Sequence, residues 1–162
     1  MELIPKSRLD LLSEMEDRYE KHDKDYFVKL LTDEDFVIRC RAVCILVDMG
    51  GEDVVPHISR ILKNDPNELV RHEAAFSLGQ MCLRSGIPPL EDATRNDESL
   101  FVRHEAAVAL GVIGSQEARE TLQKALLDSS EQVRDSAVVA LSNLKFMEKL
   151  CKNEKFAKLT GG

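Results

Sequence analysis

The chain has 162 residues and a formal charge of −7, with 43% hydrophobic and 31% charged residues. This acidic balance argues against nucleic acid as the main partner, because phosphate binding needs clustered Lys and Arg. Aromatic residues make up only 5% and Trp is absent, which favours closely packed helices over a β-sandwich, in one domain over residues 1–162.

The N-terminal segment predicts a capping helix over residues 7–20. Its apolar residues recur at helical spacing, at Leu9, Leu12, Met15 and Tyr19. Charged residues interrupt the first apolar run, so no signal peptide is expected, and no apolar run approaches the roughly 20 residues that span a bilayer. The expected location is therefore cytoplasmic, with no membrane partner. Residues 25–31 then predict the first helix of the first full repeat.

From residue 33 onward, four segments follow one pattern. Each begins with an aspartate and has an arginine six residues later: Asp33 and Arg39, Asp65 and Arg71, Asp97 and Arg103, Asp128 and Arg134. The aspartates lie 32, 32 and 31 residues apart. The chain therefore contains an internal repeat, with copies that start near residues 33, 65, 97 and 128.

Each copy is interpreted as two helices. In the third copy, residues 98–113 carry one apolar stripe, and the next helix, opening at Ser115 or Gln116, carries another. Asp97 precedes the first helix, where a carboxylate can cap free N–H groups, and Gly114 is a plausible C-cap. Residues 146–158 predict a C-terminal capping helix.

A single helical pair cannot bury its apolar stripe, so neighbouring pairs are expected to stack into an all-α superhelix of about four hairpins. The period and the Asp-to-Arg spacing resemble HEAT repeats of the phycobilisome-lyase type. This resemblance implies that the repeat Asp and Arg residues form a structural ladder between neighbouring copies, with the Asp-initiated helices lining a concave surface.

Four cysteines, at positions 40, 44, 82 and 151, show no CxxC spacing. In a cytosolic chain they predict buried thiols rather than disulfides. Cys40 and Cys44 are one helical turn apart, which leaves a metal site there as an alternative.

The two residues after each repeat arginine differ among the copies. They are Cys40-Arg41, His72-Glu73, His104-Glu105 and Asp135-Ser136. Adjacent residues on a helix are about 100° apart, and stacked helices lie roughly 8–10 Å apart, so a histidine from each copy could reach a common point. Two imidazoles and one carboxylate suit non-haem Fe(II). The alternative to metal binding is that one repeat arose by duplication of the other and kept the same His-Glu residues without a metal-binding role.

Three stretches, residues 72–81, 87–90 and 102–111, carry a more specific resemblance. They resemble deoxyhypusine hydroxylase, a HEAT-repeat di-iron monooxygenase that hydroxylates a modified lysine on a translation factor. The similarity extends over about residues 33–144. It implies that His72, Glu73 and His104 hold one iron, while Glu105 lies nearby and acts in catalysis by meeting the cationic amine of the protein substrate. Glu105 is also counted with these three as a candidate metal ligand.

The resemblance covers only half of that enzyme, because this chain has two His-Glu pairs and the family has four. A di-iron centre would therefore need a second copy, most simply in a symmetric homodimer. Two other functions stay open: a HEAT-repeat scaffold that binds a protein without catalysis, and a bilin lyase or chaperone-like subunit.

Overall fold

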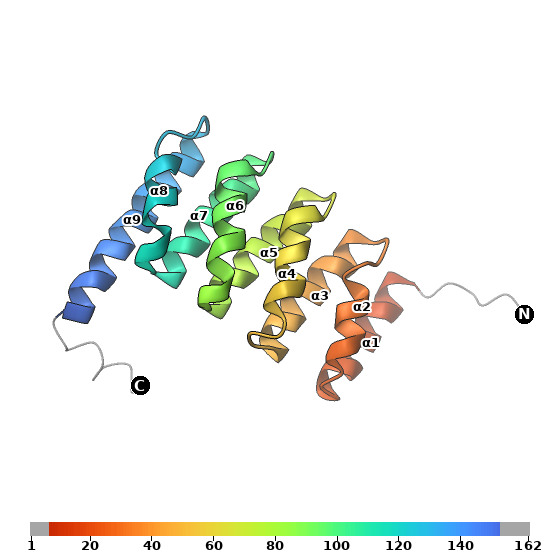
Figure 1. Ribbon diagram of the computed structural model, residues 1–162. Coiled ribbons are helices and arrows are strands. Elements are labelled where there is room, and N and C mark those ends of the chain that lie inside the picture. Colours follow the sequence, from red (N-terminus) through yellow and green to blue (C-terminus); the bar gives the residue numbers. More distant parts are fainter. Residues whose placement is uncertain (1–6, 153–162) are drawn as a thin grey trace, which may run out of the picture.

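The computed structural model describes residues 7–152, and all regular structure in that range is helical (Figure 1). This confirms the predicted all-α fold. No helix in residues 7–152 is both long and apolar enough to span a membrane. The α-helices are α1 (Arg8–Glu20), α2 (Lys24–Leu30), α3 (Phe36–Met49), α4 (Val55–Asn64), α5 (Glu68–Met81), α6 (Ile87–Asn96), α7 (Leu100–Ile113), α8 (Arg119–Ala125) and α9 (Glu131–Lys152). Short 3₁₀ turns, η1 (Arg84–Gly86) and η2 (Gln116–Ala118), precede α6 and α8.

The helices form two layers. Helices α3, α5, α7 and α9 pack in succession and make the odd layer, while α2, α4, α6 and α8 make the even layer (Figure 1). The apolar stripes of both layers meet between them. Leu46, Leu78 and Leu110 occupy the same slot in three copies and are fully buried. Each such side chain contributes about 1.5–3 kcal/mol of burial, so the repeat pattern itself builds the core.

The repeat aspartates and arginines form the expected ladder between neighbouring copies. In each rung the arginine binds both carboxylate oxygens of the next copy's aspartate, with Nε to Oδ2 distances of 2.7 Å for Arg39–Asp65, 2.9 Å for Arg71–Asp97 and 2.8 Å for Arg103–Asp128. The Nη1 of each of these arginines also donates to the backbone carbonyl of its own copy's aspartate. The ladder therefore stabilises both the turn within a copy and the stacking between copies.

The predicted helix start in the third copy was wrong by two residues. Helix α7 begins at Leu100, and its N-cap is Ser99 rather than Asp97. The Asp97 carboxylate accepts the backbone N–H of Ser99 at 2.8 Å and binds the arginine of the preceding copy. Asp97 thus shapes the turn before the helix, as in an Asx-turn. The helix ends as expected, with Gly114 in the left-handed conformation at φ 70°.

Neighbouring odd-layer helices approach closely at glycines one repeat apart. A Cβ atom at Gly79 would lie 2.7 Å from the Cβ of Ala109, and one at Gly111 would lie 2.8 Å from the Cβ of Ala140. Both distances are too short for real atoms, so only glycine fits there. These contacts bring α5 to α7 and α7 to α9, and so determine which side chains can meet across the layer.

The two ends of the stack differ from each other. At the N-terminal end, α1 follows Ser7, which forms a reciprocal capping box with Asp10. At the other end, the predicted separate helix over 146–158 was wrong for residues 146–152, because α9 runs unbroken to Lys152; residues 153–158 lie outside the described residues. The equivalent helices of the earlier copies end at Gly50, Cys82 and Gly114, whereas the equivalent residue of α9 is Lys145. Lysine has no preference for the left-handed conformation that ends a helix, so α9 continues.

Candidate metal centre

The structure brings His72 of α5 and Glu105 of α7 together. The His72 Nε2 lies 3.4 Å from the Glu105 Oε2, with the side chains 36% and 12% exposed. The two residues come from neighbouring copies. Helices α5 and α7 pack closely, so the His position of one copy lies opposite the Glu position of the next. The carboxylate is mostly shielded from water while the imidazole edge stays accessible.

His104 makes the corresponding contact with the next copy. Its Nδ1 lies 2.6 Å from the Oγ of Ser136 on α9, and that Oγ lies 2.7 Å from the backbone carbonyl of Gln132. The hydroxyl has one proton, which it donates to the carbonyl, so it must accept from the Nδ1–H of His104. A neutral His104 therefore carries its lone pair on Nε2. An imidazole oriented through its other nitrogen in this way is typical of a metal ligand.

Glu73 points to the preceding copy instead. The Cys44 thiol on α3 donates to the Glu73 Oε1 at 3.0 Å. Burial first, and then this hydrogen bond to a carboxylate, raise the pKa of Cys44 to about 12. The thiol is therefore protonated at neutral pH. The Cys44 side chain is thus engaged with Glu73, and in the described part of the chain no third His, Cys, Asp or Glu is grouped with Cys40 and Cys44 to hold a metal.

The cysteine predictions had a mixed outcome. Cys40, Cys44 and Cys82 are free thiols, as expected for a chain without disulfides. The expectation that they are buried was wrong: Cys40 and Cys44 are half-buried, and Cys82 is exposed at the end of α5. Cys82 adopts a left-handed conformation, with φ at 52°, in the slot that Gly114 occupies one repeat later. It ends a helix and does not fill the core. The Cys151 side chain lies outside the described part.

These contacts form a row across the odd layer: Cys44 with Glu73, His72 with Glu105, and His104 with Ser136. Among the four residues proposed from sequence as metal ligands, only His72 and Glu105 contact each other. Within residues 7–152, no three His, Cys, Asp or Glu side chains are grouped so that they could hold a metal ion. Sequence reasoning did not predict the contacts of Cys44 with Glu73 and of Ser136 with His104, although Ser136 occupies the slot of Glu73 and Glu105.

The His72–Glu105 pair has the spacing of two ligands on one ion. Two ligands each about 2.1 Å from an ion, at an angle of 90–109°, lie about 3.0–3.4 Å apart. The separation of 3.4 Å between Nε2 and Oε2 agrees with this range. An imidazole nitrogen and a carboxylate oxygen also match the donors of non-haem Fe(II) sites. The pair thus fits two neighbouring ligand positions, and a third donor is not in place in the described residues.

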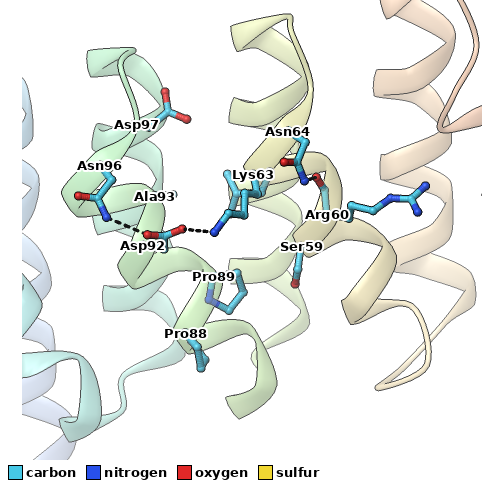
Figure 2. A pocket seen from close by; sticks show the side chains of 11 residues that line it. Ser59, Arg60, Lys63, Asn64, Pro88, Pro89, Asp92, Ala93, Asn96 and Asp97 are labelled. Carbon is cyan, nitrogen blue, oxygen red and sulfur yellow. Dashed lines mark hydrogen bonds and ion pairs between the residues drawn. The ribbon is translucent and has the colours of Figure 1, made fainter.

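Two hollows lie near the repeat helices. One, of about 560 Å³, continues the row beyond Cys44 and is lined by residues of α1 and α3, including Glu16, Glu20 and Asp48. Another, of about 760 Å³, lies between α4 and α6 of the even layer (Figure 2). There Lys63 and Asp92 pair at 3.2 Å. None of the row residues lines the second hollow.

Comparisons with known proteins identify the repeat family and two similar proteins. A HEAT-repeat family model matches residues 11–79 and 55–142. A deoxyhypusine hydroxylase of Cryptococcus neoformans var. neoformans is 38% identical over 111 residues, which are 67% of this chain and 30% of that protein. The solved structure of human deoxyhypusine hydroxylase in complex with glycerol matches with a TM-score of 0.73 and 31% identity, over 85% of this chain and 48% of that chain. The chain thus spans about half the human protein and less than a third of the fungal one, and the resemblance seen in the sequence is confirmed.

Proposed function

The chain belongs to the HEAT-repeat family, and on that premise we propose that it is a deoxyhypusine-hydroxylase-like, iron-dependent protein that hydroxylates a modified lysine side chain on another protein. The observation that carries the proposal is the His72–Glu105 pair at 3.4 Å, beside a His104 ring oriented by Ser136. Similarity to two deoxyhypusine hydroxylases supports the reaction class.

His72 and Glu105 are the proposed iron ligands that already face each other, and His104 is the proposed third ligand, which is not in place in the described residues. Glu105 is preferred to Glu73 because it faces His72, whereas Glu73 accepts a hydrogen bond from Cys44. This exchanges the roles inferred from sequence, in which Glu73 is a ligand and Glu105 meets the substrate. Bound iron would supply the oxygen chemistry that hydroxylation needs. Glu73 would then orient the substrate's cationic amine through a charge-assisted hydrogen bond.

A second copy of the chain is proposed to complete the centre as a homodimer. The chain spans about half of the human enzyme, and it carries two of the family's four His-Glu pairs. Exposed apolar side chains flank the site: Phe76 follows His72 by one turn of α5, and Phe101 precedes His104 by three residues. Apolar surface around a polar centre is typical of a face that a partner covers. A net charge of −7 suits a cationic side chain of a translation-factor-like protein substrate.

The test is iron binding by the full chain, purified with Fe(II) under anaerobic conditions and measured by elemental analysis. We expect iron to co-purify with the wild type and to fall to background in His72→Ala and in Glu105→Ala. His57→Ala on α4 is the matched control, because it removes a histidine of the even layer. If His57→Ala loses as much iron as His72→Ala, or if the wild type holds none, the metal proposal fails.

The homodimer is tested separately by light scattering of the iron-loaded protein. A dimer that Phe76→Asp converts to a monomer supports a second copy facing the His-Glu row. A monomer that still binds iron refutes the dimer while leaving the metal site intact. The same exposed Phe76 and Phe101 also favour a second candidate, a protein-binding scaffold. An iron-free protein that binds a partner through these two side chains would support the scaffold.

A further inference from the structure

Helix α9 repeats, on its outward face, the pattern by which α5 and α7 bind their neighbours. In α5 this pattern is Arg71, Ala75 and Gly79, and in α7 it is Arg103, Ala107 and Gly111. The three residues are four apart, so they lie on one helical face. The equivalent residues of α9 are Arg134, Val138 and Ser142, which we call the end face. Helix α9 is the last helix of the stack in the described part (Figure 1).

Arg134 is prepared for a rung of the ladder. Its Nη1 donates to the carbonyls of Asp128 at 2.8 Å and Ser129 at 3.0 Å, as Arg103 does to the equivalent carbonyls of its own copy. In Arg103 the remaining edge, Nε and Nη2, binds the carboxylate of Asp128. Within residues 7–152, no such carboxylate binds that edge of Arg134. The guanidinium is thus held in a position that a carboxylate pair would complete.

The apolar part of the end face is exposed where its counterparts are buried. Val43, Ala75 and Ala107 are each 0% exposed because the next odd-layer helix covers them, whereas Val138 is 56% exposed. Ser142 lies in the slot of Gly79 and Gly111, which Val47 fills in α3. Its Cβ rules out the very close approach seen at the two glycines, but the slot accepts a side chain where α3 packs on α5. Charge and exposed apolar surface thus agree along one face of α9.

We propose that the end face of α9 binds a helical hairpin of the same repeat type, supplied by another polypeptide, whose turn presents an aspartate to Arg134. Two observations identify this occupant. The end face continues the interface already seen between α7 and α9, and its free guanidinium edge complements the carboxylate that each of the three formed rungs uses. The inference is independent of the iron site, because no residue of the His-Glu row takes part.

The experiment measures binding of a labelled helical-hairpin peptide to the full chain by fluorescence anisotropy. The peptide is residues 115–150, which includes α8 and the turn with Asp128, and it carries Val138→Asp so that it presents only its α7-binding side. We expect the wild-type chain to bind it. Val138→Asp or Arg134→Ala in the chain should weaken binding at least tenfold, and Val139→Asp, the adjacent exposed valine, should leave it unchanged.

A double-mutant cycle then tests the new rung. Asp128→Ala in the peptide should weaken binding, and combining it with Arg134→Ala in the chain should cost no more than either change alone. Circular dichroism of the variant chains checks that they stay folded. No binding by the wild-type chain overturns the proposal. Binding that survives Val138→Asp also overturns it, since the peptide would then displace the chain's own α8 and α9 from α7. Self-association of the chain alone that Val138→Asp abolishes would overturn it in favour of a second copy.

Discussion

Removal of the central ladder carboxylate, by Asp97→Ala, is expected to destabilise the stack strongly. Asp97 accepts from the Arg71 Nε at 2.9 Å, the Arg71 Nη2 at 3.0 Å and the Ser99 backbone N–H at 2.8 Å. Both charged side chains are buried. Without Asp97, Arg71 keeps one backbone acceptor, the Asp65 carbonyl, and the exposed Glu98 at 3.4 Å.

The expected loss is about 3–5 kcal/mol, because breaking a buried ion pair leaves an uncompensated charge. A domain of this size has about 5–15 kcal/mol of unfolding free energy, so the loss is a large fraction of the total. Urea unfolding followed by circular dichroism measures this loss of unfolding free energy. An unchanged m-value would show that the substitution altered stability without altering the surface exposed on unfolding. Asp92→Ala is the matched control: its partner Lys63 is exposed, and we expect a loss below about 1 kcal/mol.

A second substitution separates the buried charge from the lost hydrogen bonds. Adding Arg71→Met to Asp97→Ala removes the unpaired guanidinium and keeps apolar volume, so the double variant should be more stable than Asp97→Ala alone. Equal losses in Asp97→Ala and Asp92→Ala would refute the reasoning that the buried ladder stabilises the stack. So would a double variant less stable than Asp97→Ala.

Four further predictions follow from single sites. Cys82→Gly should raise the unfolding free energy by about 1 kcal/mol, measured by urea unfolding, because glycine relieves the left-handed conformation of Cys82. Gly79→Ala should lower it by about 1–3 kcal/mol, since the new Cβ would lie 2.7 Å from the Cβ of Ala109. The pKa of the Asp128 carboxyl is raised by burial but lowered more by hydrogen bonds, the largest from Arg103, and ends below its usual value. The ionised carboxylate therefore contributes its full stabilisation above about pH 5, and this contribution is lost as the pH falls through the folded-state pKa. In Asp128→Asn, the unfolding free energy should thus fall less steeply between about pH 5 and pH 3 than in the wild type. At pH 8, a thiol reagent should modify exposed Cys82 rapidly and Cys44 slowly, because the pKa of Cys44 is about 12; equal rates would contradict the shielding of Cys44 by burial and Glu73.

The fold was predictable because repetition multiplies each local signal. A single Asp-to-Arg spacing is weak evidence, but the same spacing in four copies, first at Asp33 and Arg39, identifies the repeat. The ladder that this resemblance implied is present in three rungs. Helix ends were less predictable where one residue serves two purposes. Asp97 looked like an N-cap, yet its carboxylate is used by the preceding copy's arginine, and the helix begins only at Leu100.

The candidate site was half predictable. Comparing the copies identified His72, Glu73, His104 and Glu105, because only the second and third copies carry His-Glu directly after the repeat arginine. Their pairing was not visible, because sequence neighbours such as His72 and Glu73 look like partners. In the structure each contacts a different copy: His72 meets Glu105, and Glu73 meets Cys44.

The sequence by itself determined that the chain is a helical repeat, which residues depart from it, and which family it resembles. Those features depend on periodicity and spacing, which are local along the chain. Only the tertiary structure decided which histidine faces which carboxylate, that α9 runs on without a break, and that its outer face is exposed. These depend on the register between helices, set by contacts as specific as Gly79 against Ala109, and no single helix encodes that register.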